Sequence, residues 1–150
     1  MIAWREDMGL GIEGLDEEHK ALVNLINDFD HCKSRKAAYH VAQSVLVQTK
    51  HYFQREEELQ AAFAYANLPL HHSDHDRIVK EMDILITGAF LDHRLNDHAA
   101  SLIMSEWMRD LVIGHMLVHD MKLRQAVRDH TAFMPPSLAP ETGSQLSAAL

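Results

Sequence analysis

The sequence predicts an all-α protein: a four-helix bundle whose helices run up, down, up and down, preceded by an irregular N-terminal arm. Three observations predict it. Four segments carry apolar residues at three- and four-residue intervals, which is the spacing of one helix face. Only four prolines and six glycines occur in 150 residues, which favours long, uninterrupted helices. The connections between the segments are short, and short connections favour antiparallel neighbours.

The N-terminal arm, residues 1–15, holds apolar residues interrupted by three glycines, and we expect its apolar groups to lie against the bundle. The first helix is predicted over about residues 16–33. Asp16 stands where an N-cap belongs, and two glutamates follow it in the first turn, where acidic groups are favourable. The apolar face of this helix consists of Leu22, Val23, Ile26 and Phe29.

The second helix is predicted over about residues 36–66, a stretch without proline or glycine. Pro69 separates it from the third helix, because proline disfavours helix at the preceding residue and suits the first turn of the next one. Gly88 is the expected end of the third helix. The fourth helix is predicted over about residues 97–129.

We expect one domain, residues 1–133, followed by a flexible C-terminal tail, residues 134–150, which is rich in proline, serine and small residues. Cys32 is the single cysteine, so the chain cannot form an internal disulfide or a four-cysteine zinc site. One unpaired thiol fits a reducing compartment, and we therefore expect the protein to be cytoplasmic.

The charge and hydropathy of the chain argue against two classes of partner. A net charge of −8 repels phosphate backbones and anionic lipid, so we expect no nucleic acid and no membrane among the partners. No apolar run approaches the ~20 residues of a membrane span, and the N-terminus lacks the features of a signal peptide. We expect a soluble monomer.

Candidate metal ligands are distributed over all four predicted helices. His71 and His75 are four residues apart, so they lie on one face of a helix and can direct two imidazoles at one point. Because the chain holds 12 histidines, such a pair is informative only if further ligands converge on it. The further inward-facing candidates are His19 on the first helix, Glu56 on the second, and His115 and Asp120 on the fourth.

The spacing of His115 and Asp120 differs from that of the other pair. Five residues at ~100° per residue place two side chains ~140° apart around an α-helix. We therefore expect these two residues to reach a dinuclear centre from its two sides rather than to share one ion.

These motifs resemble the bacteriohemerythrins, members of the hemerythrin family of oxygen-binding, non-haem di-iron proteins. The resemblance covers roughly residues 4–125, and the spacing between its pieces also fits. The pieces are Trp4, Gly11-Ile12, Leu15-Asp16-Glu-Glu-His19-Lys with Leu22 and Asn27, Phe53-Gln-Arg-Glu56-Glu57, His71-x-x-x-His75 and His115-x-x-x-x-Asp120.

The resemblance implies two iron ions joined by carboxylates and by an oxo or hydroxo bridge. By position, His71, His75 and His115 are the implied terminal ligands of one iron, and His19 is that of the other. Glu56 and Asp120 are the implied bridges. The family pattern also implies an apolar pocket around the ions, for which the candidates are Leu22, Phe53, Leu111, Val112 and Met116.

The chain departs from the family pattern at one ligand position. The family has a histidine four residues before the bridging glutamate, where this chain has Tyr52, while His51 stands one place too early. Tyr52 shares a helix face with Glu56, whereas His51 points ~140° away from Glu56 unless a π-bulge corrects the register. We predict that Tyr52 faces inward and takes the place of the histidine as a ligand of the second iron.

The resemblance implies a protein that binds O2 for carriage, storage or sensing and is not an enzyme. The alternative is a di-iron redox enzyme acting on peroxide or nitric oxide, in which the altered second iron is the reactive one. A sensor module that signals through its tail is a third reading. The expected ligand is O2 or another small diatomic molecule or peroxide.

Overall fold

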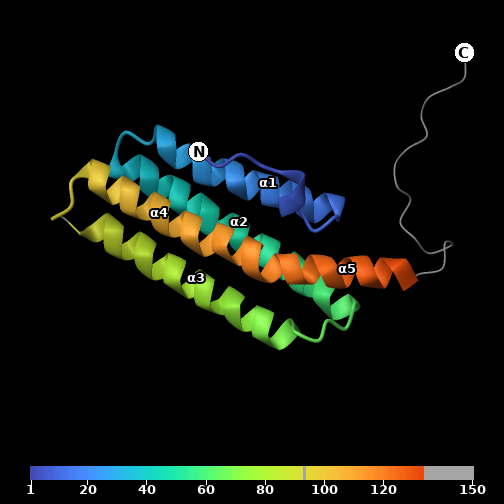
Figure 1. Ribbon diagram of the computed structural model, residues 1–150. Coiled ribbons are helices and arrows are strands. Elements are labelled where there is room, and N and C mark those ends of the chain that lie inside the picture. The colour runs from blue at the N-terminus through green and yellow to red at the C-terminus, as the bar shows by residue number, and fades with distance from the viewer. Residues whose placement is uncertain (93, 134–150) are drawn as a thin grey trace, which may run out of the picture.

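The computed structural model describes residues 1–92 and 94–133, so the predicted tail, residues 134–150, lies outside the described residues. Four long helices form the bundle: α1 (Glu13–Asp28), α2 (Arg35–Ala62), α3 (Leu68–Leu91) and α4 (Asp97–His115). A π-helical turn, η3 (Met116–Asp120), continues α4 into α5 (Met121–Phe133). Figure 1 shows the helices running alternately in opposite directions, which confirms the predicted all-α, up-down-up-down bundle.

The core lies along the axis between the helices, and each helix packs against its neighbours in sequence, with further contacts from α4 to α1 and α2. The antiparallel arrangement brings the start of α1, the second half of α2, the start of α3 and the end of α4 to the same end of the bundle. Fully buried residues come from all four helices, among them Leu22, Ile26, Val45, Ile78, Met82, Met104 and Met108.

The first predicted boundary is wrong, because α1 begins before Asp16 and ends at Asp28, where a 3-10 turn, η2 (Phe29–His31), follows. Asp16 is not the N-cap. Its carboxylate accepts hydrogen bonds from the backbone N–H groups of Leu10 (2.6 Å) and Gly11 (3.0 Å), and so it holds the end of the arm against the helix. Gly11 has a φ of 85°, a conformation that glycine adopts at least cost.

The arm itself, which includes the short 3-10 helix η1 (Glu6–Met8), packs on the bundle as expected. Met8 and Leu10 are buried, and the indole of Trp4 lies 6.1 Å from the imidazole of His19 between ring centres. The arm therefore covers the side of the bundle from which α1 contributes its histidine.

The predicted ends of the second and third helices are also wrong. α2 ends at Ala62, four residues early, in a turn where Ala64 has a φ of 51°. α3 passes through Gly88 to Leu91. The guanidinium of Arg35 donates hydrogen bonds to the carbonyl oxygens of Phe90 (3.1 Å) and Asp92 (2.8 Å), so the end of α3 is held by a side chain from α2 rather than by a glycine.

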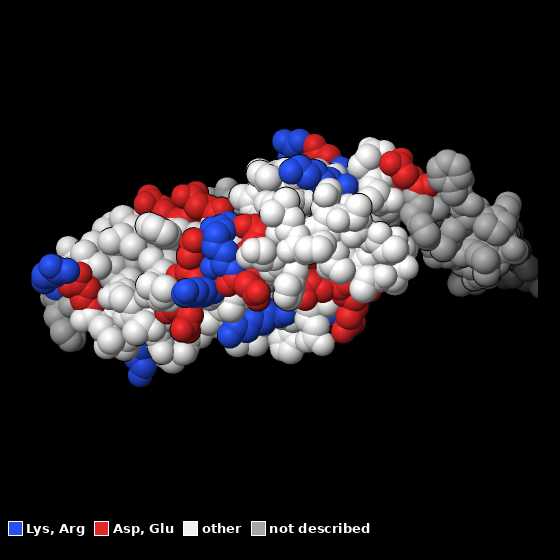
Figure 2. All heavy atoms as spheres, turned by 90° about the horizontal axis from the view of Figure 1, so that it is seen from below, with Lys and Arg blue, Asp and Glu red and all other residues white. Residues whose placement is uncertain are grey.

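The start of α4 at Asp97 matches the prediction, and the side chain of Asn96 caps it by accepting a hydrogen bond from the N–H of Ala99 at 2.8 Å. None of the described helices is both long enough and apolar enough to cross a membrane. On the face shown in Figure 2, acidic and basic side chains are interspersed and separated by uncharged surface.

Candidate metal centre

Three imidazoles from two helices meet at one point. His71 and His75 lie near the start of α3, whose second residue is Pro69, and His115 is the last residue of α4. All three side chains are almost fully buried. The Nε2 atom of His115 lies 3.0 Å from Nε2 of His71 and 3.0 Å from Nε2 of His75.

A carboxylate from α2 closes this group. Glu56 is fully buried, and its Oε2 atom lies 3.2 Å from Nε2 of His75 and 3.4 Å from Nε2 of His71. These four residues each offer one ligand atom, and the four atoms lie within 4.8 Å of one another. The structure therefore brings together the predicted ligands of the first ion.

The π-turn η3 corrects the expectation for His115 and Asp120. A π-turn takes up one more residue than an α-helical turn, so residues five apart come to the same face of the helix. The Oδ1 atom of Asp120 lies 3.0 Å from Nε2 of His115 and 3.4 Å from Nε2 of His71. The two side chains thus meet at the centre and do not approach it from opposite sides.

The second oxygen of Asp120 faces the other predicted ligands. Its Oδ2 atom lies 3.0 Å from Nε2 of His19 and accepts a hydrogen bond from the hydroxyl of Tyr52 at 3.2 Å. The rings of His19 and Tyr52 are 4.4 Å apart between centres. Tyr52 is buried and His51 is exposed, because α2 is α-helical throughout and keeps the unslipped register.

The donor atoms of the cluster fit a cation better than they fit one another. Both carboxylate oxygens of Glu56 and Oδ1 of Asp120 are buried and have no hydrogen-bond partner among the described residues. Three Nε2 atoms that face one point cannot all donate to or accept from each other. Ligands about 2.1 Å from one ion and at right angles stand about 3.0 Å apart, which is the spacing of these nitrogens.

The outward nitrogens of the three imidazoles contact residues whose positioning role could not be predicted from the sequence. Nδ1 of His75 lies 2.6 Å from Oε1 of Glu57, and Nδ1 of His115 lies 2.7 Å from Oδ2 of Asp74. The carboxamide of Gln60 lies 3.0 Å from Nδ1 of His71. The amide nitrogen of Gln60 is the atom that faces Nδ1, and a 180° rotation of the carboxamide would let its oxygen accept from Nδ1–H, which leaves the lone pair of Nε2 of His71 free for a metal.

Burial and charge set the protonation of these side chains. Burial disfavours the charged form of Asp120, but the neighbouring histidines, His115 first, outweigh it and hold the pKa of Asp120 well below its usual value. Burial also lowers the pKa of the imidazoles, yet Asp120 and Glu56 raise that of His115 to about 10 and that of His71 to about 8. The pKa of Tyr52 is raised well above its ordinary value, first by burial and then by the charges of Asp120 and Glu56. Its hydroxyl is therefore a neutral donor.

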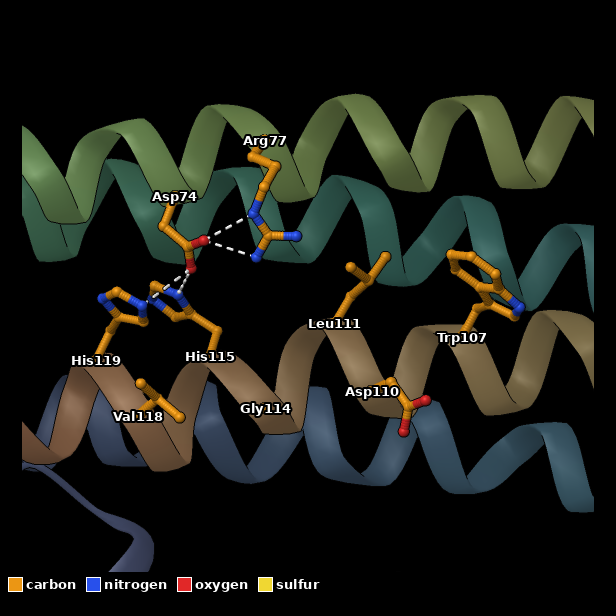
Figure 3. Close-up of a pocket in the computed structure, with 9 residues that line it drawn as sticks. All are labelled: Asp74, Arg77, Trp107, Asp110, Leu111, Gly114, His115, Val118 and His119. Carbon is orange, nitrogen blue, oxygen red and sulfur yellow. Dashed lines mark hydrogen bonds and ion pairs between the residues drawn. The ribbon is translucent and has the colours of Figure 1, made fainter.

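A pocket of about 400 Å³ opens between α3 and α4 on the outer side of His115 (Figure 3). Asp74 stands at the centre of the polar residues there. It bonds His115, lies 3.6 Å from Nε2 of His119 and pairs with Arg77 at 2.6 Å. The imidazole of His119 is parallel to that of His115, with ring centres 5.1 Å apart. The apolar part of the pocket wall comes from Trp107, Leu111 and Val118.

The five apolar residues predicted to surround the ions are all buried. Phe53 is the best defined of them, because its ring stacks on that of His75 with ring centres 3.7 Å apart and an 8° angle between the planes. Its ring centre also lies 5.0 Å from that of His115. The ring of Phe53 therefore flanks two imidazoles of the cluster.

Comparison with known proteins finds relatives that all carry the same name. The chain is 28% identical to a bacteriohemerythrin of Clostridium acetobutylicum over 90 residues, which cover 55% of this chain and 70% of that protein. It is 25% identical to bacteriohemerythrins of Pseudomonas paraeruginosa and Pseudomonas aeruginosa over 146 residues, covering 81% of this chain and 95% of each relative. No protein-family model matches the chain. The relatives support membership in the hemerythrin family and, together with the buried cluster of histidines and Glu56, a hemerythrin-like metal-binding protein.

Proposed function

We propose that this chain holds two iron ions and binds O2 without turning it over. The observation that carries the proposal is the convergence of three imidazole nitrogens, 3.0 Å apart in two pairs, next to buried carboxylate oxygens that lack hydrogen-bond partners among the described residues. Iron suits such a mixed set of imidazole and carboxylate ligands. The similarity to bacteriohemerythrins supports the same reading.

Each predicted ligand has a role in this proposal. His71, His75 and His115 would hold one ion, and His19 and Tyr52 would hold the other. The carboxylates of Glu56 and Asp120 would hold both ions. Support for the bridging role comes from Asp120, whose Oδ1 faces His115 at 3.0 Å while its Oδ2 faces His19 at 3.0 Å.

Ferrous ions, when bound, would supply the electrons with which O2 is held, and the protein supplies the surroundings. Leu22, Leu111 and Met116 are buried, and we propose that they form an apolar lining that excludes water and protons from the centre. Phe53 packs flat on His75 and restricts the rotation of that ring. Asp74 and Glu57 fix the orientation of His115 and His75 through their outward nitrogens.

Metal analysis of the purified protein tests the proposal. We expect two iron ions per chain after anaerobic reconstitution, since the seven donors exceed what one ion can use and two of them are placed to bridge. Optical spectra of the oxidised protein and of the reduced protein exposed to air should differ by bands of the di-iron centre. A stoichiometry that stays at one ion or below would contradict the proposal.

Tyr52 should change the behaviour of the second ion. A phenolate is a hard anionic donor, so its coordination favours Fe(III) over Fe(II), and the protein should oxidise readily in air and hold O2 poorly. We expect a phenolate-to-iron charge-transfer band in the ferric protein. Tyr52→Phe should abolish this band and Tyr52→His should restore longer-lived O2 binding, whereas Tyr39→Phe, at an exposed hydrogen bond to Gln43, should change neither.

The same experiment tests the register of α2. If the ferric spectrum changes with His51→Ala and not with Tyr52→Phe, then His51 is the ligand and the assignment of Tyr52 is wrong.

A second candidate function is a di-iron redox enzyme acting on peroxide or nitric oxide. Tyr52 favours it, because an ion that is readily oxidised suits redox turnover better than reversible O2 binding. Catalytic consumption of peroxide or nitric oxide, with rapid decay of the oxygenated form, would support the enzyme. Stable oxygenation without consumption would support the O2-binding protein.

A further inference from the structure

The two halves of the candidate metal centre differ in how their imidazoles are held. In the three-histidine half, the Nδ1 atoms of the ligands face Gln60 (3.0 Å), Glu57 (2.6 Å) and Asp74 (2.7 Å). In the other half, Nδ1 of His19 is buried and has no hydrogen-bond partner within the described part of the chain. Such outer partners fix the orientation of a ligand ring and strengthen its donor nitrogen. The three-histidine half is therefore prearranged for an ion, and the His19 half is less so.

The two halves also differ in the atoms that they offer. The three-histidine half adds three imidazole nitrogens to the shared carboxylates of Glu56 and Asp120, whereas the other half adds one nitrogen from His19 and the oxygen of Tyr52. Imidazole suits iron, cobalt and zinc, while oxygen donors suit harder ions such as Mn²⁺. The second half therefore discriminates less against a hard ion.

The two halves also differ in how freely an ion can reach their donor atoms. In the three-histidine half, Nε2 atoms already face a common point at 3.0 Å. In the His19 half, Oδ2 of Asp120 is contacted both by Nε2 of His19 at 3.0 Å and by the hydroxyl of Tyr52 at 3.2 Å. An ion entering this half has to displace two contacts of one carboxylate oxygen, whereas an ion entering the other half displaces the 3.0 Å contact between Oδ1 of Asp120 and Nε2 of His115.

We propose that the two positions fill in order and differ in the ion that they prefer. The three-histidine position fills first, with an ion that prefers nitrogen, such as Fe²⁺, Co²⁺ or Zn²⁺. The His19–Tyr52 position fills second and more weakly, and it takes a harder ion such as Mn²⁺ or Fe³⁺. The proposal rests on the proposed function, because it requires two adjacent metal positions.

The first experiment titrates the full chain, freed of metal by a chelator, with Co²⁺ and follows visible absorption. We expect two separate steps, the second at least about tenfold weaker than the first, which is the size of effect that outer partners of a metal ligand exert. Binding of both ions in a single step, with one unchanging spectrum, would overturn the ordered filling and leave the proposed function intact. Absence of any tight step would overturn the proposed function itself.

The second experiment adds one equivalent of Zn²⁺ and then Mn²⁺, and measures bound Mn²⁺ by electron paramagnetic resonance and both metals by elemental analysis. We expect one ion of each kind per chain. Tyr52→Phe should lose Mn²⁺ at least about tenfold more readily while keeping Zn²⁺, and Tyr39→Phe should bind both like the wild type. Retention of Mn²⁺ by Tyr52→Phe, or failure of the wild type to take up Mn²⁺, would overturn the selection of a harder ion.

Discussion

Two helices bring carboxylates to the candidate metal centre by different backbone geometries. α2 is an unbroken α-helix in which Tyr52 and Glu56, four residues apart, both face the centre. The helix formed by α4 and α5 is interrupted by the π-turn η3, which brings His115 and Asp120, five residues apart, to one face. The comparison shows that a spacing of four follows from regular helix geometry, whereas a spacing of five requires a local change of the backbone.

The interactions of Asp120 explain why the π-turn is stable. Because of the turn, its buried carboxylate lies 3.0 Å from His115 on one side and 3.0 Å from His19 on the other. A regular α-helix would direct this carboxylate ~140° away from His115 and leave the two buried histidines without it. The turn is therefore supported by contacts between helices and not by the local sequence of η3.

Single-residue deletions distinguish the two backbone geometries. They should have the largest effect on metal binding and on the free energy of unfolding. Gln54 is exposed on α2, and its deletion rotates the residues on one side of it by ~100° relative to those on the other. The buried face before the deletion, which includes Val45, Thr49 and Phe53, is then turned ~100° out of line with the buried Glu56 and Gln60. We expect loss of metal binding and of more than about 4 kcal/mol of the free energy of unfolding, measured by metal analysis and denaturant melts.

Deletion of Leu117 is the matched control on the other helix. Leu117 is 55% exposed and lies inside η3. Its removal leaves His115 and Asp120 four residues apart, which is the spacing of a regular α-helix, so both should still face the centre. We expect metal binding to persist. Loss of metal binding as complete as in the Gln54 deletion would contradict the comparison.

Replacement of a ligand at the π-turn should have the next largest effect. His115→Ala removes an imidazole that lies between the buried carboxylates of Glu56 and Asp120. The uncompensated charges should lower the free energy of unfolding by about 3 to 5 kcal/mol, and metal content should fall.

Thermal melts with and without a chelator provide the measurement for His115→Ala. His98→Ala, on an exposed position of the same helix, should melt like the wild type in both conditions. If the chelator shifts neither the wild type nor His115→Ala, the metal is not integral to the bundle.

The metal-free protein should lose stability both in alkali and in acid. The pKa of His115 is raised to about 10 and that of His71 to about 8, so the stability contributed by these imidazolium groups is complete below about pH 6.5 and is lost as the pH rises towards 10. The pKa of Asp120 is lowered, so its contribution is present above about pH 4 and is lost below that value.

Denaturant melts of the chelator-treated protein between pH 3 and 10 measure this dependence. We expect a maximum between about pH 4 and 6.5 and an alkaline loss on the order of a few kcal/mol. The Leu117 deletion should keep the alkaline loss, because it keeps the imidazole and the carboxylate together. A wild-type profile that is flat from pH 6.5 to 10 would contradict the charge assignment.

The smallest expected change in the free energy of unfolding comes from a substitution at the end of α2. Ala64 has a φ of 51°, and the N–H groups of Ala64 and Tyr65 bond the carbonyl oxygens of Ala61 (3.1 Å) and Gln60 (2.9 Å). This C-terminal turn usually contains glycine, because a Cβ atom disfavours the left-handed conformation.

Ala64→Gly should therefore raise the free energy of unfolding by about 1 kcal/mol. Ala66→Gly, two residues further along, is the control and should not stabilise, since Ala66 is not among the non-glycine residues with positive φ. A loss of stability in Ala64→Gly would show that the flexibility of glycine in the unfolded chain outweighs the relief of strain.

Much of the fold and of the centre could be predicted from the sequence, because it depends on regular helix geometry. Apolar residues at three- and four-residue intervals were sufficient to predict the four helices and their order. The same geometry placed His71 beside His75 and directed Tyr52, rather than His51, towards Glu56, as the burial of Tyr52 confirms. That Tyr52 binds an ion stays a prediction.

Features that depend on contacts between distant parts of the chain could not be predicted. The π-turn at Asp120 exists because α1 and α3 supply histidines to its carboxylate. The end of α3 beyond Gly88 depends on Arg35 from another helix. Asp74 and Glu57 resemble other exposed acidic residues in the sequence, and only the packing of α3 against α2 and α4 turns them towards His115 and His75. Which side chains face inward within a regular helix follows from 3.6 residues per turn and could be predicted from the sequence. How inward-facing groups on different helices meet depends on the packing of those helices and could not.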